Sequence, residues 1–156
     1  MDMIIRSGTK DDAYGIAKLY FEGTGRVLSR PNLRLDLEDY PSVIVVLNGE
    51  IVGFAYMYAF SHGIVRLDNL FVRSDLRNQG LGQKIIEYLE KHMSEEHQYM
   101  ILDNSLKYEY PNGTKKKSAR RFYERLGFKT IALIQDENGE DVTSVFLKKL
   151  KTANSK

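Results

Sequence analysis

The sequence has no cysteine and little net charge, and these absences exclude several classes of protein. Without cysteine there can be no disulfide, no thiolate nucleophile and no cysteine-ligated zinc site. The formal net charge of +2 is too small to indicate a nucleic-acid partner by itself. The three histidines, His62, His92 and His97, have neither the HExxH spacing nor another ligand spacing, so we expect no metal site.

Long apolar runs are also missing. No segment approaches the roughly 20 apolar residues of a membrane-spanning helix, and the first residues, MDMIIRSGTKDD, lack the apolar core of a signal peptide. We therefore expect a cytoplasmic protein with no membrane partner. The length of 156 residues and the ordinary globular composition predict a single domain over residues 1–150. Residues 151–156 are predicted to be a frayed C-terminal tail.

Residues 64–93 are the most informative stretch. A strand is predicted over residues 64–72, which are β-branched and apolar, and a helix over residues 81–93, where apolar residues recur at helical spacing. Gly80 and Gly82 stand at the start of that helix, where unpaired N–H groups and the helix dipole favour an anion. Glycine lets a phosphate approach the backbone, and Arg77 adds a positive charge with several donors. This stretch indicates a site for a diphosphate-bearing ligand.

Two common nucleotide motifs do not fit the same stretch. A Rossmann loop requires a third glycine in GxGxxG, and a P-loop requires GxxxxGK followed by Ser or Thr; the sequence supplies neither. A tight Gly-x-Gly turn without a ligand stays open as an alternative, because short glycine motifs often match by chance.

The rest of the chain shows further strand and helix patterns. We expect strands over residues 3–6, 42–47, 51–60, 99–104, 128–134 and 141–147. We expect helices after a capping box at Thr9–Asp12, with a buried face of Ala13, Ile16, Ala17 and Tyr20, and over residues 33–39 and 118–126. Asn48-Gly49 suits a type I′ hairpin turn, the strand after the central helix suits a parallel crossover, and residues 107–117 are predicted to be a polar loop.

Two motifs together resemble the GCN5-related N-acetyltransferase (GNAT) family. The family's cofactor motif, R/Q-x-x-G-x-G/A, is matched by Arg77, Gly80 and Gly82, and its A-x-x-F-Y-E-x-x-G-F segment is similar to residues 119–128. The resemblance covers roughly residues 64–128. It implies an α/β (mixed α+β), acyl-CoA N-acyltransferase-like fold. Such a fold has a central twisted mixed sheet of six to seven strands, flanked by about four helices, that opens between its fourth and fifth strands.

The resemblance implies acetyl-CoA as co-substrate and no metal. The residues implied for its pyrophosphate are Arg77, Asn78, Gln79, Gly80, Leu81 and Gly82. The strand end Leu70-Phe71-Val72 would pair with pantetheine through the backbone of Phe71 and Val72. The family often carries an asparagine three residues before the alanine of the second motif, where this chain has Lys116. Either that contact is lost or Asn104 substitutes for it.

The same resemblance implies an N-acetyltransferase that moves an acetyl group to a primary amine by direct attack in a ternary complex. Tyr123, the tyrosine of the second motif, would protonate the leaving thiolate; alternatively it only packs in the core. Asp68 would deprotonate the amine, directly or through water, or hold the incoming ammonium; alternatively it only pairs with Arg66 on the same strand face.

Several alternatives stay open. The chain could be a non-catalytic acyl-CoA-binding or sensing module. The basic cluster in residues 115–121 could contact CoA or an acidic partner, could be solvated surface, or, as a weaker interpretation, could bind nucleic acid. The acceptor could be a small-molecule amine or a peptide or protein amine. The irregular segment 23–40 corresponds to the region that lies over the acceptor site in the family, or it is a solvated connector. Exposed edge strands would permit a homodimer.

Overall fold

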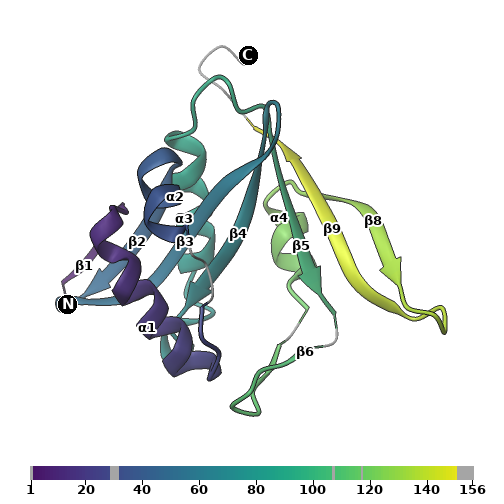
Figure 1. The fold of residues 1–156 in the computed structure, drawn as a ribbon, viewed down its shortest axis with the longest axis horizontal. Helices are drawn as coiled ribbons and strands as arrows, with labels where there is room; N and C mark the ends of the chain where they lie inside the picture. The colour runs from purple at the N-terminus through teal and green to yellow at the C-terminus, as the bar shows by residue number, and fades with distance from the viewer. Residues whose placement is uncertain (1, 29–31, 107, 117, 151–156) are drawn as a thin grey trace.

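The computed structural model describes residues 2–28, 32–106, 108–116 and 118–150, so the predicted tail lies outside the described residues. A seven-stranded sheet forms its centre, with strand order β1-β2-β3-β4-β5-β9-β8 (Figure 1). β4 and β5 run parallel, and the other neighbouring strands run antiparallel. The strands are β1 (Met3–Ser7), β2 (Ser42–Leu47), β3 (Glu50–Ser61), β4 (Ile64–Val72), β5 (Tyr99–Ser105), β8 (Lys129–Gln135) and β9 (Asp141–Lys149). The mixed α/β fold and the number of strands confirm the prediction.

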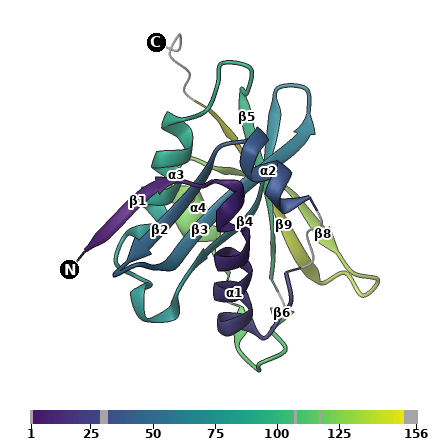
Figure 2. The same cartoon turned by 60° about the vertical axis from the view of Figure 1, so that its left-hand side comes forward.

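Four α-helices flank the sheet in the part of the chain that the structure describes. They are α1 (Ala13–Thr24), α2 (Leu33–Asp39), α3 (Leu81–Lys91) and α4 (Arg120–Arg125). α1 and α2 cover one face of the sheet, and α3 and α4 lie on the other (Figure 2). Each face therefore has its own apolar core. Among the described residues, no helix is both long enough and apolar enough to cross a membrane.

Local sequence signals set several of these boundaries. Thr9 and Asp12 form the predicted capping box, in a 3₁₀ turn over Lys10–Asp12 that leads into α1. Asn48 and Gly49 both have positive φ, 50° and 83°, as a type I′ turn requires, and they join β2 to β3. The short helix α2 has the predicted bounds. Cap chemistry thus determines the start of the turn before α1, and turn chemistry determines the junction of β2 and β3.

The sheet opens between β4 and β5. In the described residues the two strands pair over Ile64–Arg66 and Tyr99–Ile101, and then their ladder ends. Figure 1 shows β4 and β5 side by side at one end of the sheet and diverging toward the other end. The expectation that the sheet opens between its fourth and fifth strands is confirmed. We call this gap the opening.

One loop prediction was wrong. Residues 107–117 contain a short hairpin, in which β6 (Tyr108–Glu109) pairs with β7 (Lys115–Lys116). The backbone N–H of Asn112 donates to the carbonyl of Thr24, and its side-chain Nδ2 donates to the carbonyl of Gly23. The hairpin therefore docks on the C-terminal end of α1. Two-residue strands are too short to show a period, so the sequence pattern missed them.

Candidate active site

The end of β4 directs main-chain groups into the opening. Arg73 N–H donates to the Val52 carbonyl at 2.8 Å, and Val72 lies opposite Gly53. This geometry makes Val72 a non-hydrogen-bonded position of the antiparallel ladder, so its N–H and C=O point away from β3. The alternation gives the same orientation to Leu70 and pairs the backbone of Phe71 with β3. Leu70 and Val72 thus present polar main-chain groups to the opening, and the prediction that the backbone of Phe71 does so was wrong, because it pairs with β3.

The glycine loop after β4 forms an open helix start. Gly80 precedes α3 with a φ of 83°, and a Cβ added to it would meet no atom within 4 Å. Among the described residues, no side chain caps the first turn of α3. The N–H groups of Leu81, Gly82 and Gln83 therefore lack intrahelical partners, and the helix dipole adds to their attraction for an anion.

The loop is tied to the strand end by Arg77. Its Nε donates to the Val72 carbonyl at 2.8 Å, and its guanidinium carbon lies 5.1 Å from the centre of the Phe71 ring. Asn78, with a φ of 62°, turns the chain, and Gln79 Nε2 donates to the Asp75 carbonyl at 3.3 Å. The guanidinium of Arg77 is thereby held against the end of β4.

Gly82 has a different structural role from Gly80. A Cβ at Gly82 would lie 2.9 Å from Cζ of Phe122, closer than real Cβ contacts allow. The absence of a side chain lets the first turn of α3 pack against α4. The two sequence motifs are therefore in direct contact, and Gly82 is explained by this packing without any ligand.

Tyr123 is buried in the core beneath α3 and α4. It is 8% exposed, and its ring centre lies 5.0, 5.5 and 5.6 Å from the ring centres of Phe122, Phe128 and Phe146. This burial disfavours the phenolate and raises the pKa of Tyr123 well above its usual value near 10. The phenol is therefore protonated at neutral pH, the form that a proton donor needs.

Asn104 lies across the opening on β5. Its side chain is 3% exposed, and its Nδ2 has no hydrogen-bond partner among the described residues. Met100 and Leu102 belong to the core beneath α3 and α4, and alternation along β5 puts Asn104 on the same face. A buried amide without a partner costs on the order of 1–3 kcal/mol. This side chain is suited to a polar ligand group that enters the opening.

Asp68 occupies a bulge in β4. Tyr56 of β3 pairs with Asn69 and Met57 pairs with Leu67, so Asp68 is the additional residue between them. Strict alternation would put Asp68 and Asn69 on opposite faces, but with the bulge both line one pocket. Arg66, the alternative partner for Asp68, forms an ion pair with Asp103 of β5.

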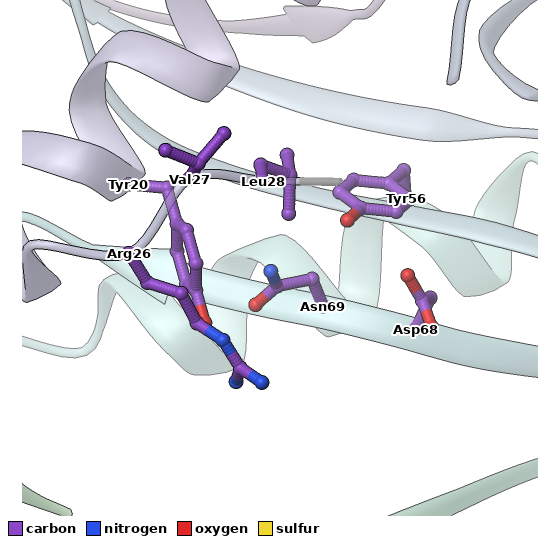
Figure 3. Close-up of a pocket in the computed structure, with 7 residues that line it drawn as sticks. All are labelled: Tyr20, Arg26, Val27, Leu28, Tyr56, Asp68 and Asn69. Atoms are coloured by element: carbon purple, nitrogen blue, oxygen red, sulfur yellow. The ribbon is translucent and has the colours of Figure 1, made fainter. Parts of the chain in front are cut away.

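The pocket lies on the face covered by α1 and α2 and has a volume of about 260 Å³ (Figure 3). Its lining residues are Tyr20, Arg26, Val27, Leu28, Tyr56, Asp68 and Asn69. Residues 26–28 of the irregular segment 23–40 line this pocket together with Asp68. The other lining residues were missed, because alternation in the sequence does not show a bulge, and the contact of α1 with β3 and β4 is long-range.

The sequence-predicted residues lie on both faces of the opening. Leu81 and Tyr123 belong to the core beneath α3 and α4, against which Leu70 and Val72 pack. Asp68 faces the pocket on the opposite side. Tyr123 and the Asp68 carboxylate therefore lie on opposite faces of the sheet. In the described part of the chain, no three His, Asp or Glu side chains lie close enough together to hold a metal ion.

The comparisons with known proteins agree with this geometry. The family model described as "Acetyltransferase (GNAT) domain" matches residues 39–130, more than half of the chain. The chain belongs to the GNAT acetyltransferase family. No curated protein sequence matches the chain.

Solved structures show the same fold at low identity. The ribosomal-protein-S18-alanine N-acetyltransferase from Escherichia coli is 19% identical with a TM-score of 0.75, and the match covers 98% of this chain and 97% of that one. Ard1 from Thermoplasma volcanium is 15% identical with a TM-score of 0.74, covering 97% and 99% of the two chains. An aminoglycoside 6'-N-acetyltransferase complexed with coenzyme A is 20% identical with a TM-score of 0.69, covering 94% and 96%.

Proposed function

We propose that this protein is an acetyl-CoA-dependent N-acetyltransferase that moves an acetyl group to a primary amine by direct attack in a ternary complex. The observation that carries the proposal is the opening between β4 and β5, which has an anion-binding helix start at one edge and Asp68 and Tyr123 on its two faces. The family match and the similarity to an acetyltransferase complexed with coenzyme A support this assignment.

The residues around the opening fit acetyl-CoA. Arg77, Asn78, Gln79 and the N–H groups of Gly80, Leu81 and Gly82 would hold the pyrophosphate. Main-chain groups of Leu70 and Val72 would pair with the amides of pantetheine, while Phe71 would support Arg77 through its ring. Asn104 would donate to pantetheine from β5 and so satisfy its buried amide. We propose no metal in the reaction.

Acetyl-CoA supplies a thioester whose acyl carbon takes the amine nitrogen, so a C–N bond forms as the C–S bond breaks. An alkylamine has a pKa of about 10 and is mostly protonated at pH 7, so it must lose a proton before it attacks. Asp68 would accept that proton, directly or through a water, and Tyr123 would donate its proton to the leaving sulfur. Holding both reactants in one geometry would supply much of the rate.

The setting of the reaction is part of the proposal. The domain over residues 1–150 would act in the cytoplasm, whose reducing conditions suit a chain without cysteine. The acceptor would be a small-molecule amine or a peptide or protein amine. Neither a nucleic acid nor a membrane is needed as a partner.

The first test is thermal stabilisation by acetyl-CoA. A ligand at about 100 times its Kd adds about 2.7 kcal/mol to the unfolding free energy, which raises Tm by roughly 5–10 °C for a chain of this size. Gly80→Asp puts a carboxylate where we expect the pyrophosphate and should lose most of that rise. Gly80→Asn has the same shape without the charge and tolerates positive φ, so it should retain more of the rise.

Two outcomes would contradict the proposal. No rise in Tm for folded wild-type protein would remove acetyl-CoA as the ligand. Equal rises for Gly80→Asp and wild type would mean that the glycine loop does not hold the pyrophosphate. Turnover is then measured as release of the CoA thiol with a panel of amines. Because the chain has no cysteine, the protein contributes no thiol to that signal.

A further inference from the structure

The pocket beside the opening carries opposite charges at its two ends. Figure 3 shows the guanidinium of Arg26 at one end of the group of lining residues and the carboxylate of Asp68 at the other, with Asn69 between them. The rings of Tyr20 and Tyr56 and the aliphatic side chains of Val27 and Leu28 make up the rest of the lining. A purely cationic acceptor, such as a polyamine, would use the negative end and be repelled by the positive one.

The main chain of Arg26 is anchored, and its side chain is exposed. Its backbone N–H donates to Oγ1 of Thr24 at 3.0 Å, and that hydroxyl donates to the Tyr20 carbonyl at 2.7 Å. Thr24 is fully buried, and Gly25 closes α1 with a φ of 76° and an N–H bond to the Phe21 carbonyl. The main chain therefore enters the pocket from an anchored point.

The negative end is positioned by the bulge in β4. Because Asp68 is the additional residue against β3, its carboxylate shares the pocket with the Asn69 amide. The proposed reaction places the amine nitrogen at Asp68. The other end of the same molecule then lies toward Arg26, whose planar guanidinium can bind a carboxylate through two parallel hydrogen bonds.

The size of the pocket limits the acceptor. Its volume of about 260 Å³ is just below the range of about 300–1,000 Å³ that is usual for drug-sized ligands. An amino acid fits such a volume.

We infer that the acceptor is a small amine that also carries a carboxylate, an amino acid or a close derivative, with its amine at Asp68 and its carboxylate at Arg26. This inference rests on the proposed acetyltransferase function. In the reaction the amine nitrogen forms the new C–N bond, its proton leaves toward Asp68, and the carboxylate is unchanged.

The test compares L-amino acids with their carboxamides, which lack the negative charge. For wild type and Arg26→Gln, kcat/KM is measured by CoA release with the proteinogenic L-amino acids and the matching amides. Arg26→Gln should lower kcat/KM for the acids by about tenfold or more, through KM, and for the amides by about twofold or less. This double comparison cancels the difference in amine basicity between acid and amide.

Two further variants control the measurement. Arg34→Gln removes an exposed arginine on α2 that is not among the pocket-lining residues, so it should leave both series unchanged. Arg26→Lys keeps the charge without the planar fork and should restore part of the preference for acids.

Three results would overturn the inference and leave the proposed function standing, provided that acetyl-CoA still stabilises the protein. The first is that the enzyme acetylates none of the amino acids. The second is that Arg26→Gln lowers kcat/KM equally for acids and amides. The third is clearly faster acetylation of polyamines or of peptide N-termini than of any free amino acid. Absence of acetyl-CoA binding, in contrast, would remove the proposed function itself.

Discussion

Two hairpins of this protein contain the same Asn-Gly dipeptide in their turns and have opposite surroundings. Asn48-Gly49 joins β2 to β3, and Asn138-Gly139 lies in the turn between β8 and β9. In β2 five of six residues are buried, whereas in β8 none of seven is. β2 lies inside the sheet with helices on both sides, and β8 is an edge strand with large apolar side chains exposed, Ile131, Leu133 and Ile134. A turn signal predicts a hairpin but not its burial.

The difference in burial between β2 and β8 extends to the two halves of the sheet, which contribute differently to stability and to the site. The β1–β4 half holds the core beneath α1 and α2, the glycine loop and the pocket. The core beneath α3 and α4 is shared with the β5–β9 half, which also contributes Asn104 and Tyr123 from the other side of the opening. The exposed apolar edge of β8 is where a second copy of the chain could pair, so a homodimer remains a prediction. The following substitutions test whether stability and catalysis are divided in this way.

The largest expected effect is on stability. Ile44→Ala in β2 empties a fully buried site and should lower the unfolding free energy by about 2–5 kcal/mol. Ile134→Ala in β8 removes a side chain that is 51% exposed and should change it by about 0.5 kcal/mol or less. Urea unfolding followed by circular dichroism measures both. Equal losses would mean that β8 is covered in solution, as a dimer through that edge would require.

The second prediction concerns the proposed catalytic role of Tyr123 in the β5–β9 half. Tyr123→Phe removes the proposed proton donor but keeps the buried ring, so kcat should fall about 100-fold or more while the Kd for acetyl-CoA and Tm change little. Tyr14→Phe, at a tyrosine that is 79% exposed on α1, is the control. An unchanged kcat in Tyr123→Phe would leave Tyr123 a packing residue. No measurable rate in either protein would favour the acyl-CoA-sensing alternative.

The smallest effect is a pH dependence within the β1–β4 half. Hydrogen bonds from Arg6, at 2.8 and 2.9 Å, are the main cause that lowers the pKa of Asp12. A carboxylate with a lowered pKa stabilises the fold above its unfolded value near 4, and this stability is lost as the pH falls through the folded value.

Asp12→Asn keeps the acceptor for the Thr9 N–H but loses the charge. The substitution should lower the unfolding free energy by about 1 kcal/mol or less at pH 7, because Arg6 is partly exposed. Below the folded pKa of Asp12, where the wild-type carboxyl is also uncharged, it should have no effect. Unfolding in urea across the acid range measures this difference. Glu124→Gln, in the exposed pair with Arg120, should have no measurable effect at any pH. A constant difference between wild type and Asp12→Asn would show that the effect is not electrostatic.

The sequence predicted the elements better than it predicted the site. Periodicity and turn chemistry indicated β4, α3 and the Asn48-Gly49 hairpin because each depends on neighbouring residues. The pocket depends on a bulge that puts Asp68 and Asn69 on one face, and on contacts between segments far apart in the chain. Likewise, the packing of Gly82 against Phe122 joins two motifs that the sequence shows separately. Local patterns contain no information on such long-range contacts.

The docking of Asn112 on α1 also has a mechanical consequence. Two halves of a sheet that are joined only along one short ladder can rotate relative to each other about that ladder. The two hydrogen bonds from Asn112 to the end of α1 join the halves a second time, away from that ladder, and the contact of Gly82 with Phe122 joins them a third time. These contacts restrict the angle between β4 and β5 in the folded chain. Because this motion is restricted before a ligand enters, binding costs the protein less conformational entropy.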